Sequence, residues 1–281
     1  MTSPAPATAN SSLPTIAFIG GGNMASAIIG GLIHQGHPAS QIEVVEPWAE
    51  AREALRKNYG IEAQAEAGPA LQRAQIVVWA VKPQTFRDAA AQAKAHTQGA
   101  LHLSVAAGIR SDSIAQWLGT ERIVRTMPNT PALVGKGMSA LYARPAVSAP
   151  ERQSIEAIMA TTGEFLWVDS EPQLDAVTAL SGSGPAYVFY FLEAMTRAGT
   201  GMGLTEQQAH QLAVGTFVGA SELARRSDDP PSVLRQRVTS KGGTTYAALQ
   251  SMEAAGVAAS FEAAMRAAQH RAHELGDEFG A

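Results

Sequence analysis

The sequence predicts an α/β protein in which a parallel sheet is followed by a purely helical region. Before residue 170, short apolar runs rich in β-branched residues alternate with helical stretches, the pattern of a largely parallel sheet. After Ser170 no strand pattern remains, and long segments with helical apolar periodicity follow. We therefore expect domains over residues 14–170 and 171–281, after a disordered tail at 1–13 that lacks the features of a secretory signal.

The individual elements follow from these patterns. Buried strands are expected at the apolar runs Thr15–Ile19, Ile42–Val45, Ile76–Val81, Leu101–Val105 and Ile123–Met127, with closing strands at Met138–Ala143 and Glu164–Val168. Helices are expected between them and throughout the second half, at Ala49–Asn58, Gln84–Ala95, Pro150–Thr161, Pro185–Met202, Thr205–Arg225 and Val257–Leu275, and from Thr244 onward. Thr205, with Gln208 three residues later, matches a capping box that starts its helix.

A glycine-rich turn, Gly20-Gly21-Gly22-Asn23-Met24-Ala25, directly follows the first strand. Gly20 would allow a sharp turn, Gly22 would let a pyrophosphate approach the backbone, and Ala25 would let the helix pack closely on the strand. The helix beginning at Asn23 would direct free N–H groups and its positive dipole end at the phosphates. The pattern predicts a Rossmann-type domain that binds NAD(H) or NADP(H), with a purely structural turn as the alternative.

Composition narrows the class of protein further. The chain has 281 residues, and 46% of them are hydrophobic, which is enough for a sizeable core. No apolar run approaches the ~18 residues of a membrane span, and the net charge of −4 argues against nucleic acid as the main partner. The absence of cysteine excludes disulfides and thiolate metal sites and fits a cytoplasmic location.

The chain as a whole is unusually poor in charge. Only 16% of the chain is charged, below the ~25% common in soluble domains, and alanine is abundant in the last hundred residues. A subunit interface would cover such helices, because the centres of oligomer interfaces are depleted in charge. We therefore expect a homo-oligomer, while a compact helical core of biased composition would explain the same numbers.

Four further segments complete an ordered series of motifs behind Gly20–Ala25. They are Ala80-Val81-Lys82-Pro83, Asn129-Thr130-Pro131, Ser181–Tyr187 and Val238–Thr245. In this order they resemble pyrroline-5-carboxylate reductase over nearly the whole chain after residue 14. The resemblance implies an NAD(P)H-dependent reduction of 1-pyrroline-5-carboxylate to L-proline, the last step of proline biosynthesis. It also implies that the helical domain mediates dimerisation, in a homodimer or a larger ring of dimers whose active sites use both domains.

The residues suit this chemistry when they are considered separately. A protonated pyrroline imine is already electrophilic, so hydride transfer requires positioning more than a strong acid. Ser240, the backbone N–H groups of Gly242 and Gly243, and the residues Thr244 and Thr245 lie just before or at the start of an expected helix, an arrangement that can capture a carboxylate. The resemblance implies that they hold the substrate carboxylate and that the Thr245 hydroxyl reaches the ring nitrogen. Ordinary helix capping is the structural alternative.

Two motifs at strand ends are expected to border the cofactor. Ala80, Val81, Lys82 and Pro83 follow a strand at the edge where open α/β sheets bind ligands. By the resemblance, these residues lie along the ribose and nicotinamide, and Asn129 borders the nicotinamide site. Each segment could also be a simple turn, and we do not assign proton transfer to Lys82.

The sequence departs from the resemblance at two positions. Glu46 ends the second strand, where an acidic side chain would bind a ribose 2′-hydroxyl and favour NADH. The family commonly prefers NADPH, however, and Arg52 offers a phosphate partner if Glu46 points away. Lys241 stands where the family usually has proline, which loosens the turn and adds a cation. We expect a tolerated change, a view that loss of activity in Lys241→Pro would contradict.

The sequence also permits a metal site and three other classes of protein to be weighed. His34 with His37, and His270 with His273, are interpreted as surface helix residues, because no partner completes a metal site. A β-hydroxyacid dehydrogenase would have a similar domain order, but Lys241 is the only candidate for its catalytic lysine. A nucleotide sensor without catalysis would not need the segment before Thr245. A methyltransferase would not explain Ala80–Pro83 or the helical second domain.

Overall fold

The computed structural model describes residues 13–280, which form two compact units. The first unit comprises the chain up to Gly182 together with the C-terminal residues from Gln269, and the second comprises Ser183–Ala268. Apart from Leu13, the expected tail at 1–13 lies outside the described residues.

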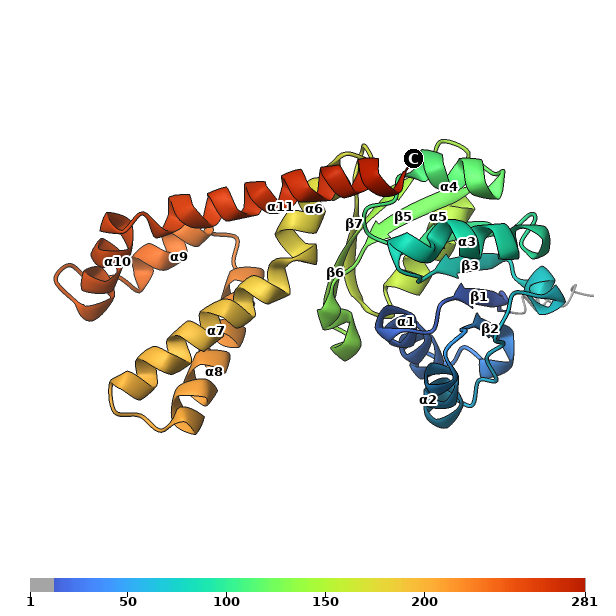
Figure 1. The fold of residues 1–281 in the computed structure, drawn as a ribbon. Helices are drawn as coiled ribbons and strands as arrows, with labels where there is room; N and C mark the ends of the chain where they lie inside the picture. Colours follow the sequence, from blue (N-terminus) through green and yellow to red (C-terminus); the bar gives the residue numbers. More distant parts are fainter. Residues whose placement is uncertain (1–12, 281) are drawn as a thin grey trace, which may run out of the picture. The chain divides into compact units, whose positions relative to one another are not determined.

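A seven-stranded sheet forms the centre of the first unit, with strand order β2-β1-β3-β4-β5-β6-β7 (Figure 1). All pairings are parallel except the antiparallel pairing of β5 with β6. The strands are β1 (Ile16–Ile19), β2 (Ile42–Val45), β3 (Ile76–Trp79), β4 (Leu101–Ser104), β5 (Ile123–Met127), β6 (Gly137–Ala143) and β7 (Gly163–Trp167). The expected strands and the largely parallel sheet are therefore confirmed. The strands β2 and β3 lie on opposite sides of β1, which makes the carboxyl end of β1 a topological switch point.

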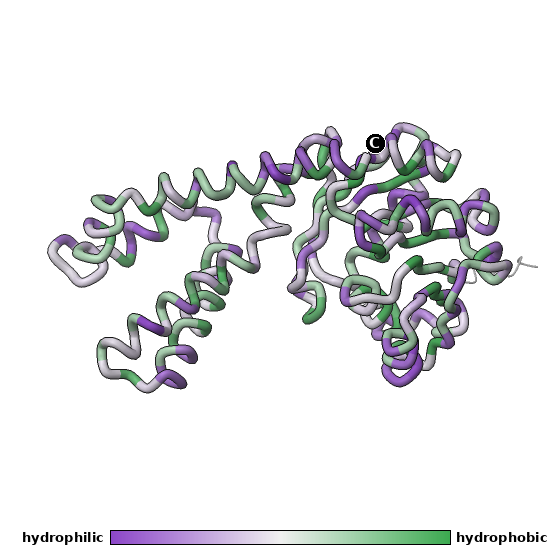
Figure 2. The backbone as a smooth tube through the Cα atoms, viewed as in Figure 1, coloured by the Kyte–Doolittle hydropathy of each residue, from purple (hydrophilic) through white to green (hydrophobic). Residues whose placement is uncertain are grey.

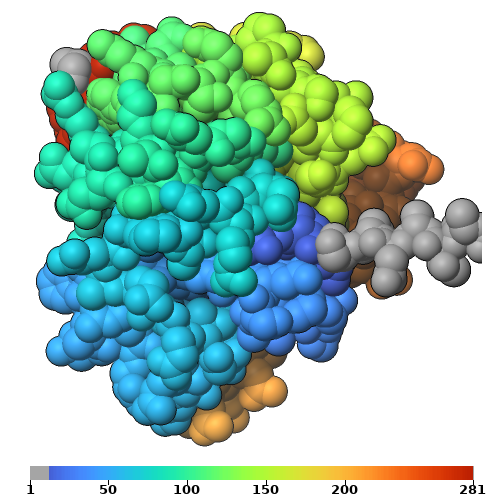
Figure 3. All heavy atoms as spheres, turned by 90° about the vertical axis from the view of Figure 1, so that its right-hand side faces the viewer, coloured from blue at the N-terminus to red at the C-terminus, as the bar shows by residue number. Residues whose placement is uncertain are grey.

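Helices cover both faces of this sheet. They are α1 (Asn23–His34), α2 (Ala49–Tyr59), α3 (Pro83–Ala93), α4 (Ser111–Leu118), α5 (Ala149–Met159) and α6 (Gln173–Val177). Short 3-10 helices lie at Ala39–Gln41, Pro69–Arg73, Lys94–His96 and Thr130–Val134, and a π-helical turn lies at Thr178–Gly182. The helices α4 and α6 were not expected from the sequence. In Figure 3 the segments of this unit, coloured blue to yellow-green, form one closely packed surface.

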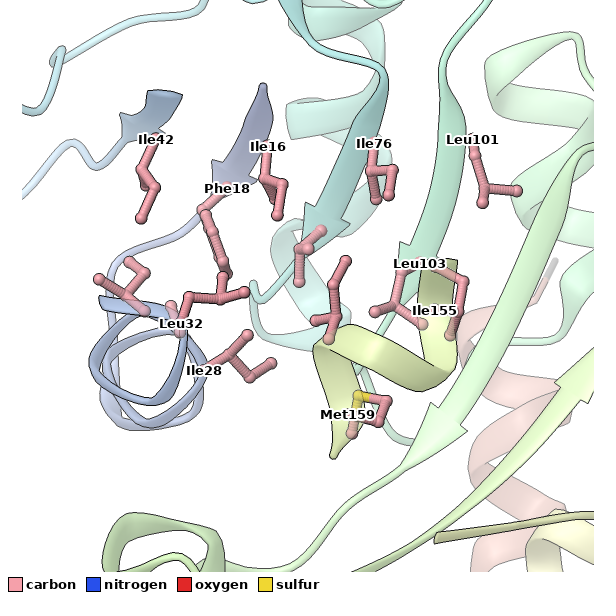
Figure 4. Close-up of a cluster of buried hydrophobic side chains, with 14 of the residues drawn as sticks. Ile16, Phe18, Ile28, Leu32, Ile42, Ile76, Leu101, Leu103, Ile155 and Met159 are labelled. Atoms are coloured by element: carbon pink, nitrogen blue, oxygen red, sulfur yellow. The ribbon is translucent and has the colours of Figure 1, made fainter. Parts of the chain in front are cut away.

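Two apolar cores result from the alternation of side chains along each strand. On β1, Ile16 and Phe18 enter one core and Ala17 and Ile19 enter the other. Figure 4 shows the first core, in which side chains of α1 and α5 meet those of β1 to β4. The second core is formed with α3 and α4, and there Phe86 stacks on Trp79 with ring centroids 4.9 Å apart. Hydrophobic residues accordingly follow the sheet, while α2 is largely hydrophilic (Figure 2).

A buried histidine on β4 makes the stability of the fold sensitive to pH. The indole N–H of Trp79 donates to Nδ1 of His102 at 3.0 Å, and His102 is only 2% exposed. Burial, assisted by the positive charge of Arg122, lowers the pKa of His102 from 6.5 to about 4. The folded chain therefore keeps this imidazole neutral at pH values where the unfolded chain protonates it. The free energy of unfolding should fall as the pH drops from 6.5 to about 4.

This pH dependence can be measured by chemical denaturation between pH 4 and pH 7. The His102 contribution should reach roughly 3 kcal/mol at the acidic end, since one pKa unit corresponds to about 1.4 kcal/mol. In His102→Gln the amide oxygen can still accept the Trp79 N–H, but the titration is gone, so the decline should be smaller by about that amount. The exposed His34 provides the control, because His34→Gln should retain the full decline. Equal pH profiles for both variants would contradict this account.

The first unit extends beyond the boundary expected at residue 170. The Glu171 carboxylate accepts the backbone N–H and the hydroxyl of Ser111, both at 2.6 Å, and Arg125 Nη1 at 2.7 Å. At the other end of the chain, Asp277 lies 2.6 Å from Arg110. These polar contacts, which apolar patterning does not reveal, attach residues 171–182 and the last turns of the chain to the sheet-bearing unit.

The second unit contains only helices, as expected. They are α7 (Gly184–Gly201), α8 (Glu206–Arg226), α9 (Pro231–Arg237), α10 (Thr244–Ala254) and the first part of α11 (Val257–Phe279). The helix α9 was not expected. The capping box is confirmed, since Gln208 N–H donates to the Thr205 hydroxyl at 3.2 Å and Thr205 N–H donates to the Gln208 side chain at 3.0 Å.

Much apolar surface remains exposed in this second unit. Phe189 on α7 is 58% exposed, and Leu212 on α8 is 59% exposed. Hydrophobic residues recur along both helices between hydrophilic ones (Figure 2). A monomer rarely leaves so many large apolar side chains uncovered, so this unit carries a surface suited to association. Within residues 13–280, no helix is long and apolar enough to cross a membrane.

Candidate cofactor and substrate sites

The turn after β1 brings together two segments that lie far apart in the sequence. Gly20 has a φ of 97°, and its N–H donates to Val45 O at 2.8 Å. A Cβ at Gly20 would lie only 2.5 Å from Ala80 O. The Ala80 N–H in turn donates to Ile19 O at 2.8 Å. Glycine is therefore required here for both its backbone conformation and its close approach, as expected from the sequence.

The following glycine has a different environment. Gly22 is the N-cap of α1 with an ordinary φ of −72°, and a Cβ placed there would have no atom within 4 Å. Among the described residues, no side chain caps this helix end. Gly22 and Asn23 are exposed, Met24 is half-buried, and Ala25 is fully buried against the core. The open space and the uncapped helix N-terminus fit a bound pyrophosphate.

Glu46 lies beneath this loop and is only 7% exposed. Its Oε2 accepts the Gly21 N–H at 2.7 Å, and its Oε1 accepts the Trp48 N–H at 2.9 Å. Arg52 Nη1 donates to the carbonyl oxygens of Glu46 at 2.9 Å and Pro47 at 2.7 Å. Both carboxylate oxygens therefore hold backbone groups. The side chain ties the glycine loop to the connection between β2 and α2.

The other expected cofactor segments also lie at carboxyl ends of strands. Val81 follows β3, and Lys82 is the exposed N-cap of α3 with Pro83 in the first helical turn. Asn129 follows β5, where its Nδ2 donates to Ser181 O at 3.1 Å and its Oδ1 accepts the Met138 N–H at 3.0 Å. The Asn129 side chain thus fastens its loop to two neighbouring segments. A residue bound in this way shapes the rim of the sheet.

The expected substrate residues form a turn in the second unit. The expected helix start is confirmed, because α10 begins at Thr244 with Gly243 as its N-cap. Gly242 has a φ of 76°, and Gly243 N–H donates to Ser240 O at 3.0 Å. Among the described residues, no side chain caps this helix end. The threonines are therefore not used as caps, and the exposed turn is free to accept a carboxylate.

The histidine pairs differ in part from expectation. His34 ends α1 and is exposed, but His37 lies beyond that helix and is only 8% exposed, so its interpretation as a surface helix residue was wrong. Burial lowers the pKa of His37. His270 and His273 are exposed on α11, with His273 Nδ1 at 3.4 Å from Asp175. Within the described part of the chain, no three histidine or carboxylate side chains are grouped to hold a metal ion.

One exposed residue near the cofactor loop was missed by sequence reasoning. Trp48 lies directly after β2 and is 72% exposed, although tryptophan is usually well buried. Its position three residues past the strand could have drawn attention to it. The exposure of Trp48 depends on the direction that the chain takes after Glu46, and this direction cannot be predicted from the apolar pattern of the sequence.

Comparison with known proteins follows the same division of the chain. Residues 171–275 match the family described as pyrroline-5-carboxylate reductase dimerisation. Residues 15–108 match the family described as NADP oxidoreductase coenzyme F420-dependent. The glycine loop falls in the second match and the turn before α10 falls in the first.

Whole-length relatives agree with these matches. The pyrroline-5-carboxylate reductase of Pseudomonas aeruginosa is 45% identical, covering 96% of this chain and 99% of the relative. That of Haemophilus influenzae is 41% identical, covering 92% and 97%. A solved pyrroline-5-carboxylate reductase from Coxiella burnetii has a TM-score of 0.87 at 37% identity, covering 93% of this chain and 98% of its own. A Plasmodium falciparum pyrroline carboxylate reductase solved with NADP bound has a TM-score of 0.85 at 27% identity, covering 94% and 99%. This chain therefore belongs to the pyrroline-5-carboxylate reductase family.

Proposed function

We propose that this chain is an oxidoreductase that reduces 1-pyrroline-5-carboxylate to L-proline with NADPH or NADH, the last step of proline biosynthesis. The observation that carries the proposal is the combination of two uncapped, glycine-bounded helix N-termini, one at α1 and one at α10. The first suits a cofactor pyrophosphate and the second suits a small carboxylate. Membership in the pyrroline-5-carboxylate reductase family indicates which cofactor and which carboxylate these two sites would bind.

The cofactor is held by residues at the carboxyl end of the sheet. The backbone of Gly20, Gly21 and Gly22 and the first turn of α1 at Asn23 and Met24 would surround the pyrophosphate. Ala80, Val81, Lys82 and Pro83 would border its ribose and nicotinamide, on a loop that contacts Gly20. Asn129 would form the far rim of the nicotinamide site. When bound, the cofactor supplies a hydride.

We assign Glu46 an indirect role in cofactor binding: it holds the glycine loop in place and does not itself bind the ribose. Both of its carboxylate oxygens accept backbone N–H groups, including that of Gly21. A ribose hydroxyl would have to displace one of these bonds. The guanidinium of Arg52 lies beside the same strand end and can offset the charge of Glu46 near a 2′-phosphate. The arrangement supports NADPH as the preferred cofactor.

The turn before α10 would position the substrate. The N–H groups of Gly242 and Gly243 and the hydroxyls of Ser240 and Thr244 are suited to the carboxylate. The Thr245 hydroxyl would then orient the imine nitrogen or pass a proton to it. We give Ser240 and Thr245 the catalytic roles, because hydroxyls can hold a protonated imine in place without the cost of burying a charge.

The second unit would join two copies of the chain. Its match to a dimerisation family, and exposed apolar residues such as Phe189 and Leu212, support a homodimer. Assembly of such dimers into a larger ring is a further prediction, which the molar mass from light scattering would test. The chain has no cysteine, which supports a cytoplasmic site of action.

The function is tested by following absorbance at 340 nm with purified protein and 1-pyrroline-5-carboxylate, in parallel reactions with NADPH and NADH. We expect substrate-dependent oxidation of both cofactors, with the higher kcat/KM for NADPH. A higher value for NADH would refute the role given to Arg52. No oxidation of either cofactor by folded protein would refute the reductase assignment.

A further inference from the structure

Of the four tryptophans, all within residues 13–280, only Trp48 has a ring that lies largely in water. It is 72% exposed, whereas Trp79 is fully buried, and Trp117 and Trp167 are half-buried. Trp117 packs beside Phe86, and Trp167 donates to Glu156 and lies under Arg152. The indole of Trp48 has no such partner among the described residues. An exposed ring of this size contributes none of the stabilisation that apolar burial would give, unless a ligand covers it.

The backbone that carries this ring is held on several sides. The Trp48 N–H donates to Glu46 Oε1 at 2.9 Å, and the Trp48 carbonyl accepts the Arg52 N–H at 3.1 Å. Arg52 also donates to the carbonyl oxygens of Glu46 and Pro47. The exposed ring is therefore presented by a fixed segment and not by a loose loop. Such a surface loses little conformational entropy when it binds a flat partner.

The same segment is joined directly to the glycine loop. One carboxylate, that of Glu46, accepts the Trp48 N–H through Oε1 and the Gly21 N–H through Oε2 at 2.7 Å. Trp48 therefore lies beside the loop proposed to hold the pyrophosphate, on the side of β2. In a Rossmann-type domain the adenosine half of the cofactor lies at the carboxyl end of that second strand.

We propose that the indole of Trp48 stacks on the adenine ring of the bound cofactor and forms one wall of the adenosine site. The inference rests on the proposed use of NADPH or NADH. Aromatic side chains stack well on nucleobases because both present flat π faces, and alanine in place of the aromatic residue typically weakens binding roughly 5- to 150-fold per base. Since adenine is common to NADPH and NADH, the contribution of Trp48 is the same for both.

The test uses isothermal titration calorimetry with NADPH and with 2′-phospho-ADP-ribose, which lacks the nicotinamide ring. Trp48→Ala should raise the Kd of both ligands roughly tenfold, while Trp48→Phe should stay within about threefold of the unchanged chain. Leu166→Ala removes another exposed apolar side chain of the first unit and should bind as the unchanged chain does. In the kinetic assay, Trp48→Ala should raise KM for NADPH and NADH by similar factors and leave kcat unchanged.

Intrinsic fluorescence gives an independent readout. The unchanged chain should lose emission when 2′-phospho-ADP-ribose binds, and Trp48→Phe should show little of this loss although it still binds the ligand. Equal Kd values for the unchanged chain and folded Trp48→Ala would refute the inference and leave the proposed function intact. If the unchanged chain bound neither NADPH nor 2′-phospho-ADP-ribose, the proposed cofactor site itself would be refuted.

Discussion

Replacing Gly20 by alanine should destabilise the first unit by roughly 3 kcal/mol and abolish NADPH binding. The new Cβ would lie 2.5 Å from Ala80 O, and the φ of 97° at this position is unfavourable for any side chain. A strained backbone conformation of this kind costs about 1–3 kcal/mol before the overlap is added. Chemical denaturation measures the stability, and calorimetry with NADPH measures the binding.

Gly22→Ala is the matched control for this prediction. Gly22 has an ordinary φ of −72° and open space where its Cβ would be, so the free energy of unfolding should change by less than about 1 kcal/mol. The added methyl group would nevertheless stand where a pyrophosphate approaches the backbone, so NADPH binding should weaken clearly. If Gly22→Ala bound NADPH normally, the loop would be only a structural turn. If Gly20→Ala were as stable as the unchanged chain, the close approach to Ala80 would not exist in solution.

Replacing Thr245 by alanine should lower kcat for 1-pyrroline-5-carboxylate reduction roughly 100-fold, because the imine nitrogen would lose its hydroxyl partner. Thr245 is exposed in the first turn of α10 and is not used as a helix cap, so removing its hydroxyl should not disturb the helix. The Kd for NADPH should stay unchanged, since the cofactor residues lie in the first unit. Steady-state kinetics and calorimetry separate these two effects.

Thr245→Ser separates the hydroxyl from the methyl group. The serine variant should keep most of the activity, because it retains a hydroxyl at the same place. Full activity in Thr245→Ala would remove this residue from the mechanism and leave Ser240 and the backbone N–H groups to position the substrate.

Much of the sheet could be predicted because buried strands have a strong apolar signal. The strands Ile42–Val45 and Ile123–Met127 coincide with the expected ranges, and the others differ by at most two residues at either end. The helices α4, α6 and α9 were missed because they contain only 8, 5 and 7 residues, too few for an apolar pattern to repeat along the helix. The attachment of residues 171–182 to the first unit depends on Glu171, whose partners Ser111 and Arg125 are distant in the sequence.

The cofactor site could be predicted in position but not in detail. The glycine spacing requires a turn. As the pattern implies, Gly20 lies at the tight turn against Ala80, and Gly22 faces open space where a pyrophosphate could approach. The direction of the Glu46 side chain could not be predicted, because it depends on the hydrogen bond from the Gly21 N–H, a group that the tertiary fold brings next to this carboxylate. His37 shows the same limit, since its burial follows from how the chain leaves α1.

The most direct test of the central claim is the transfer of deuterium from NADPH labelled at C4 of the nicotinamide ring. Purified protein is incubated with 1-pyrroline-5-carboxylate and each of the two C4 stereoisomers of the labelled cofactor, and the product is analysed by mass spectrometry. We predict that one isomer gives L-proline one mass unit heavier, with the deuterium on the former imine carbon. Unlabelled proline from both isomers, or no proline at all, would contradict direct hydride transfer by this chain.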